Sequence, residues 1–232
     1  YAITNKHVYA KRPNLRVNTV GGKPRVIPLD PDMDWQIAPN GPDVAAADIT
    51  DLIQETDKLS AWGEGSFATT EAMREVNVGI GDEAVMVGMF YDHHGNDKGN
   101  APVGRFGSMA HLADERFKIR LHKDYRQDAY HLIDMRSRSG FSGSPVFLYR
   151  TAVTDLTAFD HTNKSYTLDM NDPCFLMLLG IHCGQFSDRV EATKARKGPA
   201  ATEALGDPIK EGDELEIPSS MTRVLPASHI KD

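Results

Sequence analysis

Cysteine, long apolar runs and an excess of positive charge are all scarce or missing in this chain of 232 residues. The two cysteines are Cys174 and Cys183, whereas a disulfide-stabilised secreted domain usually carries more. They stand at the two ends of one apolar run, too far apart along an extended strand to bridge each other. We therefore expect two free thiols. No apolar run reaches the length of a membrane span, and no signal peptide is visible.

The formal net charge is -7, which argues against a nucleic-acid partner because no basic patch rises above the acidic background. No Gly-Lys-Ser/Thr sequence follows a run of glycines, so a phosphate-binding loop is not expected. Residue 1 is Tyr rather than Met and lies inside an expected strand. This start indicates a fragment or a processed product, and the sequence leaves the cellular location and the oligomeric state open.

Short apolar or alternating segments separated by Pro, Gly, Asn and Asp predict an all-β protein. Helical windows are few, the best being 49–59 and the terminal segment 227–230. Two segments are expected to be loops, the polar stretch 92–102 and the long charged stretch 187–218. The expected strands are 1–5, 15–20, 25–29, 44–49, 84–90, 103–109, 117–121, 129–135 and 145–149.

The composition changes over 60–81, where glycines are frequent and apolar runs are short. This change predicts two halves, residues 1–75 and residues 76–232. The histidine and the acid discussed below fall in the first half, and the serine falls in the second.

Ser142 lies in the sequence Gly-Phe-Ser-Gly-Ser-Pro-Val-Phe (140–147), which has the features of a nucleophilic serine. Gly140 and Gly143 leave room for a substrate carbonyl, and the N–H groups of Gly140 and Ser142 can form an oxyanion hole. The alternative is a glycine-rich turn with incidental serines. Ser139 and Ser144 are weaker candidates, because neither has a glycine two residues before it and one after it.

His7 follows the expected strand 1–5, so its imidazole can face a cleft as the base that accepts the serine proton. The alternative for His7 is an ordinary surface histidine. His111, His122 and His131 also lie in or near expected strands but lack this setting.

Asp43 precedes the small apolar run Val-Ala-Ala-Ala (44–47) and is the expected acid that orients His7. Asp48 and Asp51 are its rivals. If the run is a single strand, Asp48 lies an odd number of positions from Asp43 and points to the opposite face. The order histidine, acid, serine along the chain is that of chymotrypsin-like proteases.

These segments resemble the trypsin-like (chymotrypsin-fold) serine peptidases, in particular their bacterial branch. Thr-Asn-Lys-His-Val (4–8) is similar to the histidine motif of that branch, and Asp-Val-Ala (43–45) is similar to its acid motif. Gly-Asp-Glu (81–83) resembles the start of the second barrel. The serine segment together with Gly-Ile-His-Cys-Gly (180–184) resembles the bacterial glutamyl endopeptidases.

The resemblance implies two packed six-stranded antiparallel β-barrels, a short C-terminal helix and an active site between the barrels. It implies an N-terminal barrel that is incomplete at its start, and a polypeptide substrate. By resemblance, His182 contacts an acidic side chain of the substrate, and Ser137 and Arg136 are further expected substrate-binding residues, Arg136 as a source of positive charge. The alternative is that Gly-Ile-His-Cys-Gly (180–184) is a packing motif and that the arginine is solvated. Phe141 departs from the usual Asn or Asp at its position, and the acid motif continues with alanines.

No metal and no cofactor are expected. The segment Asp-His-His-Gly-Asn-Asp (92–97) has metal-ligand residue types, but a solvated loop is the preferred interpretation. The chain is thus predicted to be a serine endopeptidase. The alternative from another functional class is an inactive protein of the same fold that binds peptides or acts as a scaffold.

Overall fold

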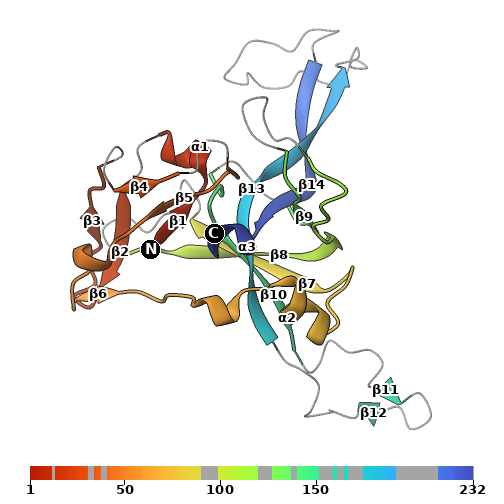
Figure 1. Cartoon of the computed structure of the whole chain (residues 1–232), viewed down its shortest axis with the longest axis horizontal. Coiled ribbons are helices and arrows are strands. Elements are labelled where there is room, and N and C mark those ends of the chain that lie inside the picture. The colour runs from red at the N-terminus through yellow and green to blue at the C-terminus, as the bar shows by residue number, and fades with distance from the viewer. Residues whose placement is uncertain are drawn as a thin grey trace, which may run out of the picture.

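The protein is described from a computed structural model (Figure 1). The residues that the structure describes are 1–11, 14–30, 34–37, 41–89, 99–119, 127–136, 140–151, 159–160, 165–166, 175–191 and 214–231.

The C-terminal half forms one closed six-stranded antiparallel barrel, with the strand order β10-β13-β14-β9-β8-β7. Side chains alternate along β7, where every second residue is buried, as expected for a strand with one face toward a core. That core contains Met86, Met109, Phe141 and Leu148, all of them at most 1% exposed. The strands are β7 (Glu83–Met89), β8 (Pro102–His111), β9 (His131–Asp134), β10 (Pro145–Arg150), β13 (Phe175–Glu191) and β14 (Glu214–Pro226).

The N-terminal half contains two small open sheets, so a second closed barrel is not seen among the described residues. Each sheet has three strands, whereas closure requires the first and last strands of a sheet to pair. One sheet has the order β1 (Ala2–Thr4), β5 (Ala45–Ala47), β4 (Trp35–Gln36). The other has the order β3 (Arg25–Ile27), β2 (Leu15–Thr19), β6 (Asp57–Lys58).

Helices are few and short in the described residues, as the sequence predicts. The expected terminal helix is present as α3 (Ser228–Lys231). The expected helix over 49–59 is wrong, because that segment holds only the 3-10 turn η1 (Thr50–Leu52) and the strand β6. The remaining elements are α1 (Lys6–Tyr9), η2 (Glu64–Ser66) and α2 (Thr70–Glu75), the last capped by the Thr69 hydroxyl, which accepts from the N–H of Ala72.

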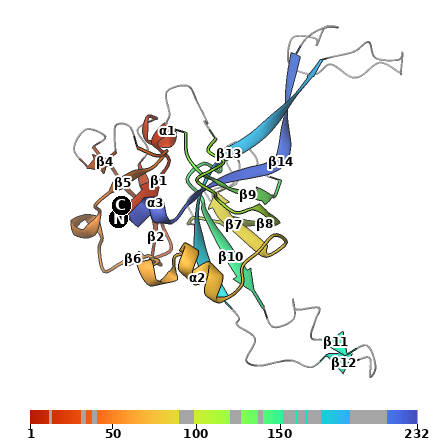
Figure 2. The same ribbon diagram turned by 45° about the vertical axis from the view of Figure 1, so that its right-hand side comes forward.

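The segment 187–218 is not wholly a loop, although the sequence predicts one. Strand β13 continues to Glu191, and β14 begins at Glu214, so the two strands pair as a long ribbon beyond the barrel (Figures 1 and 2).

The strand expected over 117–121 is not seen in its described part, because residues 117–119 form no strand and Ile119 makes only an isolated bridge with Asp128. Two short strands, β11 (Phe159–Asp160) and β12 (Ser165–Tyr166), pair apart from the barrel.

The two halves are joined by a shared apolar cluster. Tyr130, Ile181 and Leu225 of the C-terminal half are buried, and Ile3 and Val44 of the N-terminal half pack against them. Helix α3 follows β14 and lies beside the N-terminal sheets in both views (Figures 1 and 2). The junction therefore brings the ends of β1 and β5 next to β13, where the residues singled out by the sequence lie.

Candidate active site

His7 and Asp43 are in direct contact at the junction of the two halves. The imidazole Nδ1 lies 2.8 Å from Asp43 Oδ2, and the backbone N–H of His7 donates to Asp43 Oδ1 at 3.1 Å. The Asp43 side chain is fully buried, whereas the His7 side chain is 33% exposed. An ionised carboxylate accepts but does not donate hydrogen bonds, so Nδ1 carries the proton and Nε2 is the acceptor. This arrangement leaves the basic nitrogen of His7 available to a reacting group.

The backbone around this pair is held by Asn5, which is fully buried. Its side-chain Nδ2 donates to the backbone carbonyl of Asp43 at 3.0 Å and to the sulfur of Cys183 at 3.1 Å. Asn5 thus links the strand before His7 to the residue that orients His7 and to barrel strand β13. Burial raises the pKa of the Cys183 thiol, and the charge of Asp43 raises it further, so the thiol stays protonated.

His7 itself lies in α1, the single helical turn after β1, rather than at the end of a strand. The rival acids of Asp43 lie elsewhere. Asp48 is exposed, and its carboxylate accepts from the N–H and the hydroxyl of Thr50 at 3.0 and 2.6 Å, as in an Asx turn. Asp51 is also exposed, at the surface of η1. Among the three acids, Asp43 alone contacts His7 in the part of the chain that the structure describes.

Ser142 lies in a tight turn that packs against the barrel core. The Phe141 carbonyl accepts from the Ser144 N–H at 3.0 Å, and Gly143 has a φ of 83°, which suits the third position of a type II turn. The Phe141 side chain is fully buried in the core of the barrel. Phe141 therefore anchors the turn by packing in the barrel core, next to Ser142.

This turn lies against the N-terminal half and against β13. A Cβ atom on Gly143 would lie 2.5 Å from the Thr4 hydroxyl and 3.4 Å from Thr4 Cα. The Gly143 N–H donates to the His182 carbonyl at 2.9 Å. Thr4 is the last residue of β1, and α1, which contains His7, begins at Lys6. The turn that contains Ser142 therefore packs against the short connection that leads into His7.

The hydroxyl of Ser142 makes no hydrogen bond with His7 among the contacts of the described residues. Catalytic hydrogen bonds are often long before substrate binds. In the same part of the chain, no residue accepts from the backbone N–H of Gly140 or Ser142. Gly140 is exposed and has a φ of 100°, a backbone conformation that suits glycine. Neither N–H group therefore has a partner within the described residues.

The other serines and histidines have different surroundings. A Cβ atom on Gly88 of β7 would lie 2.3 Å from Ser144 Oγ, so this hydroxyl packs against the barrel wall. His131 is buried and accepts from the Ala113 N–H at 3.0 Å. His111 packs edge-on against Phe117. Ser139 and His122 lie outside the described residues.

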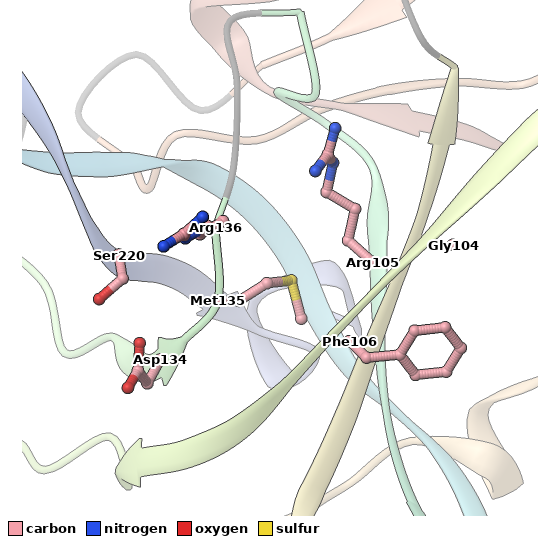
Figure 3. Close-up of a pocket in the computed structure, with 7 residues that line it drawn as sticks. All are labelled: Gly104, Arg105, Phe106, Asp134, Met135, Arg136 and Ser220. Carbon is pink, nitrogen blue, oxygen red and sulfur yellow. The ribbon is translucent and has the colours of Figure 1, made fainter.

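Two of the three expected substrate-binding residues are described. His182 is buried on β13, and its pKa is lowered to about 4 mainly by burial, while a hydrogen bond with the backbone of Phe141 acts in the opposite direction. Arg136 is exposed and lines an open pocket of about 550 Å³ with Asp134, Arg105 and Ser220. Figure 3 shows the Met135 side chain between Arg136 and Arg105 in this pocket. Ser137 lies outside the described residues.

No group of three or more His, Cys, Asp or Glu side chains is arranged to hold a metal ion in the described portion of the chain. The histidines and acids of 92–97 fall outside that portion. None of the helices described is long and apolar enough to cross a membrane.

The residue whose role sequence reasoning misses is Asn5. Asn5 belongs to the histidine motif, but nothing in its type indicates a buried link to Cys183. Comparisons with protein-family models, with curated proteins and with solved structures find no significant match to this chain.

Proposed function

We propose that this protein is a serine endopeptidase in which Ser142 is the nucleophile, His7 the base and Asp43 the residue that orients His7. The observation that carries the proposal is the 2.8 Å contact between His7 Nδ1 and the buried Asp43 carboxylate. The serine turn packs on the strand that leads into His7, which supports a common site. We also infer that the open N-terminal sheets correspond to the first barrel of a chymotrypsin-like pair.

In the first step, Ser142 Oγ attacks the carbonyl carbon of the peptide bond, and its proton passes to His7 Nε2. The carbonyl oxygen becomes an oxyanion and accepts hydrogen bonds from the N–H groups of Gly140 and Ser142. The C–N bond then breaks, and the leaving amine takes the proton from His7. The product of this half-reaction is an ester between Ser142 and the acyl part of the substrate.

In the second step, a water molecule attacks the ester carbonyl while His7 Nε2 accepts its proton. The bond to Ser142 Oγ breaks, the serine regains a proton from His7, and a carboxylic acid is released. Throughout, Asp43 keeps Nδ1 protonated and stabilises the imidazolium, because its carboxylate is buried and ionised beside the ring.

The second candidate is a non-catalytic peptide-binding protein of the same fold. The observation that favours it is the lack of a Ser142–His7 hydrogen bond among the described contacts. Against it stand the close His7–Asp43 contact, which a binding module does not need, and the N–H groups of Gly140 and Ser142, which have no acceptor among the described residues.

The test is cleavage of a mixture of unstructured peptides, followed by mass spectrometry of the products. The wild-type protein is compared with Ser142→Ala and His7→Ala, with Ser144→Ala and His111→Ala as matched controls. The proposal predicts that cleavage falls by about three orders of magnitude or more in the first two variants and persists in the controls. Peptide binding without cleavage by the folded wild-type protein would support the second candidate instead.

A further inference from the structure

Asp43 lies outside the pairing of the nearest strand, so its backbone needs another support. Strand β5 begins at Ala45, and the last pair that it makes with β1 joins Ala45 to Thr4. The N–H of Val44 donates to the carbonyl of Pro42, a local bond that bypasses Asp43. No backbone–backbone hydrogen bond holds Asp43 itself among the residues that the structure describes. The position of this residue therefore depends on hydrogen bonds with side chains.

One of these bonds comes from Asn5, the residue that follows β1. Its Nδ2 donates to the backbone carbonyl of Asp43 at 3.0 Å, and the same nitrogen donates to the sulfur of Cys183 at 3.1 Å. Both protons of the amide are thus engaged. Because Cys183 belongs to β13, the amide is fixed from the side of the barrel while it holds the carbonyl of Asp43.

Stability alone does not account for an asparagine at this position. The Asn5 side chain is fully buried, and its Oδ1 has no hydrogen-bond partner within the described part of the chain. A buried acceptor without a partner costs free energy, and an apolar side chain of similar size would not carry one. What the amide supplies in return is its donors, one of which is directed at Asp43.

The support of the Asp43 backbone bears directly on the carboxylate, because an aspartate side chain is short. Only two rotatable bonds separate its carboxylate from the backbone, so a displacement of the backbone carries the oxygens with it. Both oxygens face His7, where Oδ1 accepts from the backbone N–H at 3.1 Å and Oδ2 lies 2.8 Å from Nδ1. Asn5 and His7 therefore hold Asp43 at its carbonyl and at its carboxylate from one short segment.

We propose that Asn5 is a positioning residue, whose amide holds the backbone of Asp43 so that the carboxylate faces His7 Nδ1. The effect on catalysis rests on the proposed endopeptidase function, whereas the effect on the contact between His7 and Asp43 does not. Asn5 acts through Asp43, which keeps the imidazole in the tautomer whose Nε2 is the base. A misplacement of about 1 Å in such an arrangement lowers a rate by about 100-fold.

The experiment observes the contact between His7 and Asp43 by NMR, which requires no activity. Protein with isotope-labelled histidines gives a downfield proton resonance for a hydrogen-bonded Nδ1, and His7→Gln assigns it. Asn5→Leu keeps a similar volume without the donors, Asn5→Ala removes the amide altogether, and Asn5→Gln keeps the donors on a longer side chain. The matched control is Asn100→Leu, because Asn100 Nδ2 donates to the Arg16 carbonyl at 2.9 Å and so also joins the two halves of the chain.

The expected result is a downfield His7 Nδ1 resonance in the wild-type protein and in Asn100→Leu. The resonance is lost or moves upfield in Asn5→Leu and Asn5→Ala, and Asn5→Gln retains more of it. In peptide cleavage, Asn5→Leu lowers kcat by about 100-fold with little change in KM, whereas Asn100→Leu keeps the kcat of the wild type. Thermal unfolding verifies that each variant is folded at the temperature of the measurement.

A folded Asn5→Leu protein with an unchanged His7 resonance would overturn the proposal. An equal loss of the resonance in Asn100→Leu would also overturn it, because the cause would then be a general loosening between the two halves. If Asn5→Leu does not fold, the comparison of Asn5→Ala with Asn5→Gln decides. Loss of the resonance in the Asn5 variants of a protein that cleaves no peptide would support the positioning of Asp43 and reject the peptidase alone.

Discussion

Gly143 lies so close to Thr4 that a Cβ atom on the glycine would be 2.5 Å from the threonine hydroxyl. The contact joins the turn that carries Ser142 to the strand that leads into His7. Two halves of the chain, each with part of the candidate triad, therefore meet at one point where no extra atom fits. The contact sets how closely the serine turn approaches the strand that leads into His7.

Replacing Gly143 by Ala is expected to lower both stability and activity. The substitution adds the clash with Thr4 to the strain of a side chain at a φ of 83°. Gly22 is a matched control, because it has the same φ of 83° but no atom within 4 Å of the place that a methyl group would take. We expect chemical denaturation to show a loss of about 1–2 kcal/mol in Gly22→Ala and a larger loss in Gly143→Ala. Equal losses in the two variants would show that the Thr4 contact is unimportant.

Replacing Asp43 by Asn is expected to lower kcat by about 10⁴-fold, while substrate binding changes little. The amide can donate to His7 Nδ1, which stabilises the tautomer whose Nε2 carries the proton and cannot act as a base. The equivalent change at the exposed Asp48, whose partner is Thr50, serves as the control. Steady-state kinetics on one peptide measures both variants. An Asp48→Asn enzyme that loses as much activity as Asp43→Asn would contradict the assignment.

Acid is expected to destabilise the fold through His131. Its pKa falls from an ordinary value of 6.5 to about 3, mainly because it is buried, and nearby His111 and His229 lower it further. Between these two pH values the unfolded chain binds a proton that the folded chain does not bind. The contribution of neutral His131 to stability is therefore complete above pH 6.5 and is lost progressively as the pH falls toward 3, by up to about 1.4 kcal/mol per pH unit.

The check is the free energy of unfolding against pH for the wild-type protein and for His131→Gln. The glutamine keeps an acceptor for the Ala113 N–H, which His131 Nδ1 accepts at 3.0 Å, but it does not titrate. Whatever the stability of the variant at neutral pH, its free energy of unfolding is expected to change less steeply with pH between 6.5 and 3 than that of the wild-type protein. Parallel curves for the two proteins would rule out His131 as the source of the acid sensitivity.

The thiol of Cys183 is expected to be unreactive in the folded protein. It is 5% exposed, burial raises its pKa, and its sulfur accepts from Asn5. In a Cys174→Ser variant under native conditions, a thiol reagent should modify Cys183 no faster than the rate at which the structure around it opens. In denaturant, the modification should be rapid. Fast modification under native conditions would show that the junction around Asn5 is open to solvent.

Much of the candidate site could be predicted because its residues lie in short segments with local geometry. The contact between His7 and Asp43 follows from two motifs, and the turn at Ser142 follows from the glycines around it. The contact of Gly143 with Thr4 could not be predicted, since it depends on how the two halves pack. The link from Asn5 to Cys183 is missed for the same reason, because it joins the N-terminal strand β1 to strand β13 of the barrel.

Short apolar strands could be predicted from the sequence. Strands that are held mainly by backbone hydrogen bonds to a neighbouring strand could not. The ribbon formed by β13 and β14 pairs as far as Glu191 and Glu214, although its sequence is charged and is typical of a loop. Hydrogen bonds between two strands need no apolar alternation once the pairing has begun in the barrel. The turn α1, which carries His7, is too short for any helical periodicity to be visible.

The most direct test of the proposed triad is labelling by a fluorophosphonate, with the modified residue identified by mass spectrometry. The wild-type protein is compared with Ser142→Ala, with Ser144→Ala and with heat-denatured protein. Labelling at Ser142 in the folded wild type and in Ser144→Ala, and none in Ser142→Ala or after denaturation, is the predicted result. A folded wild-type protein that remains unlabelled, or one labelled at another residue, would contradict an activated serine at this site.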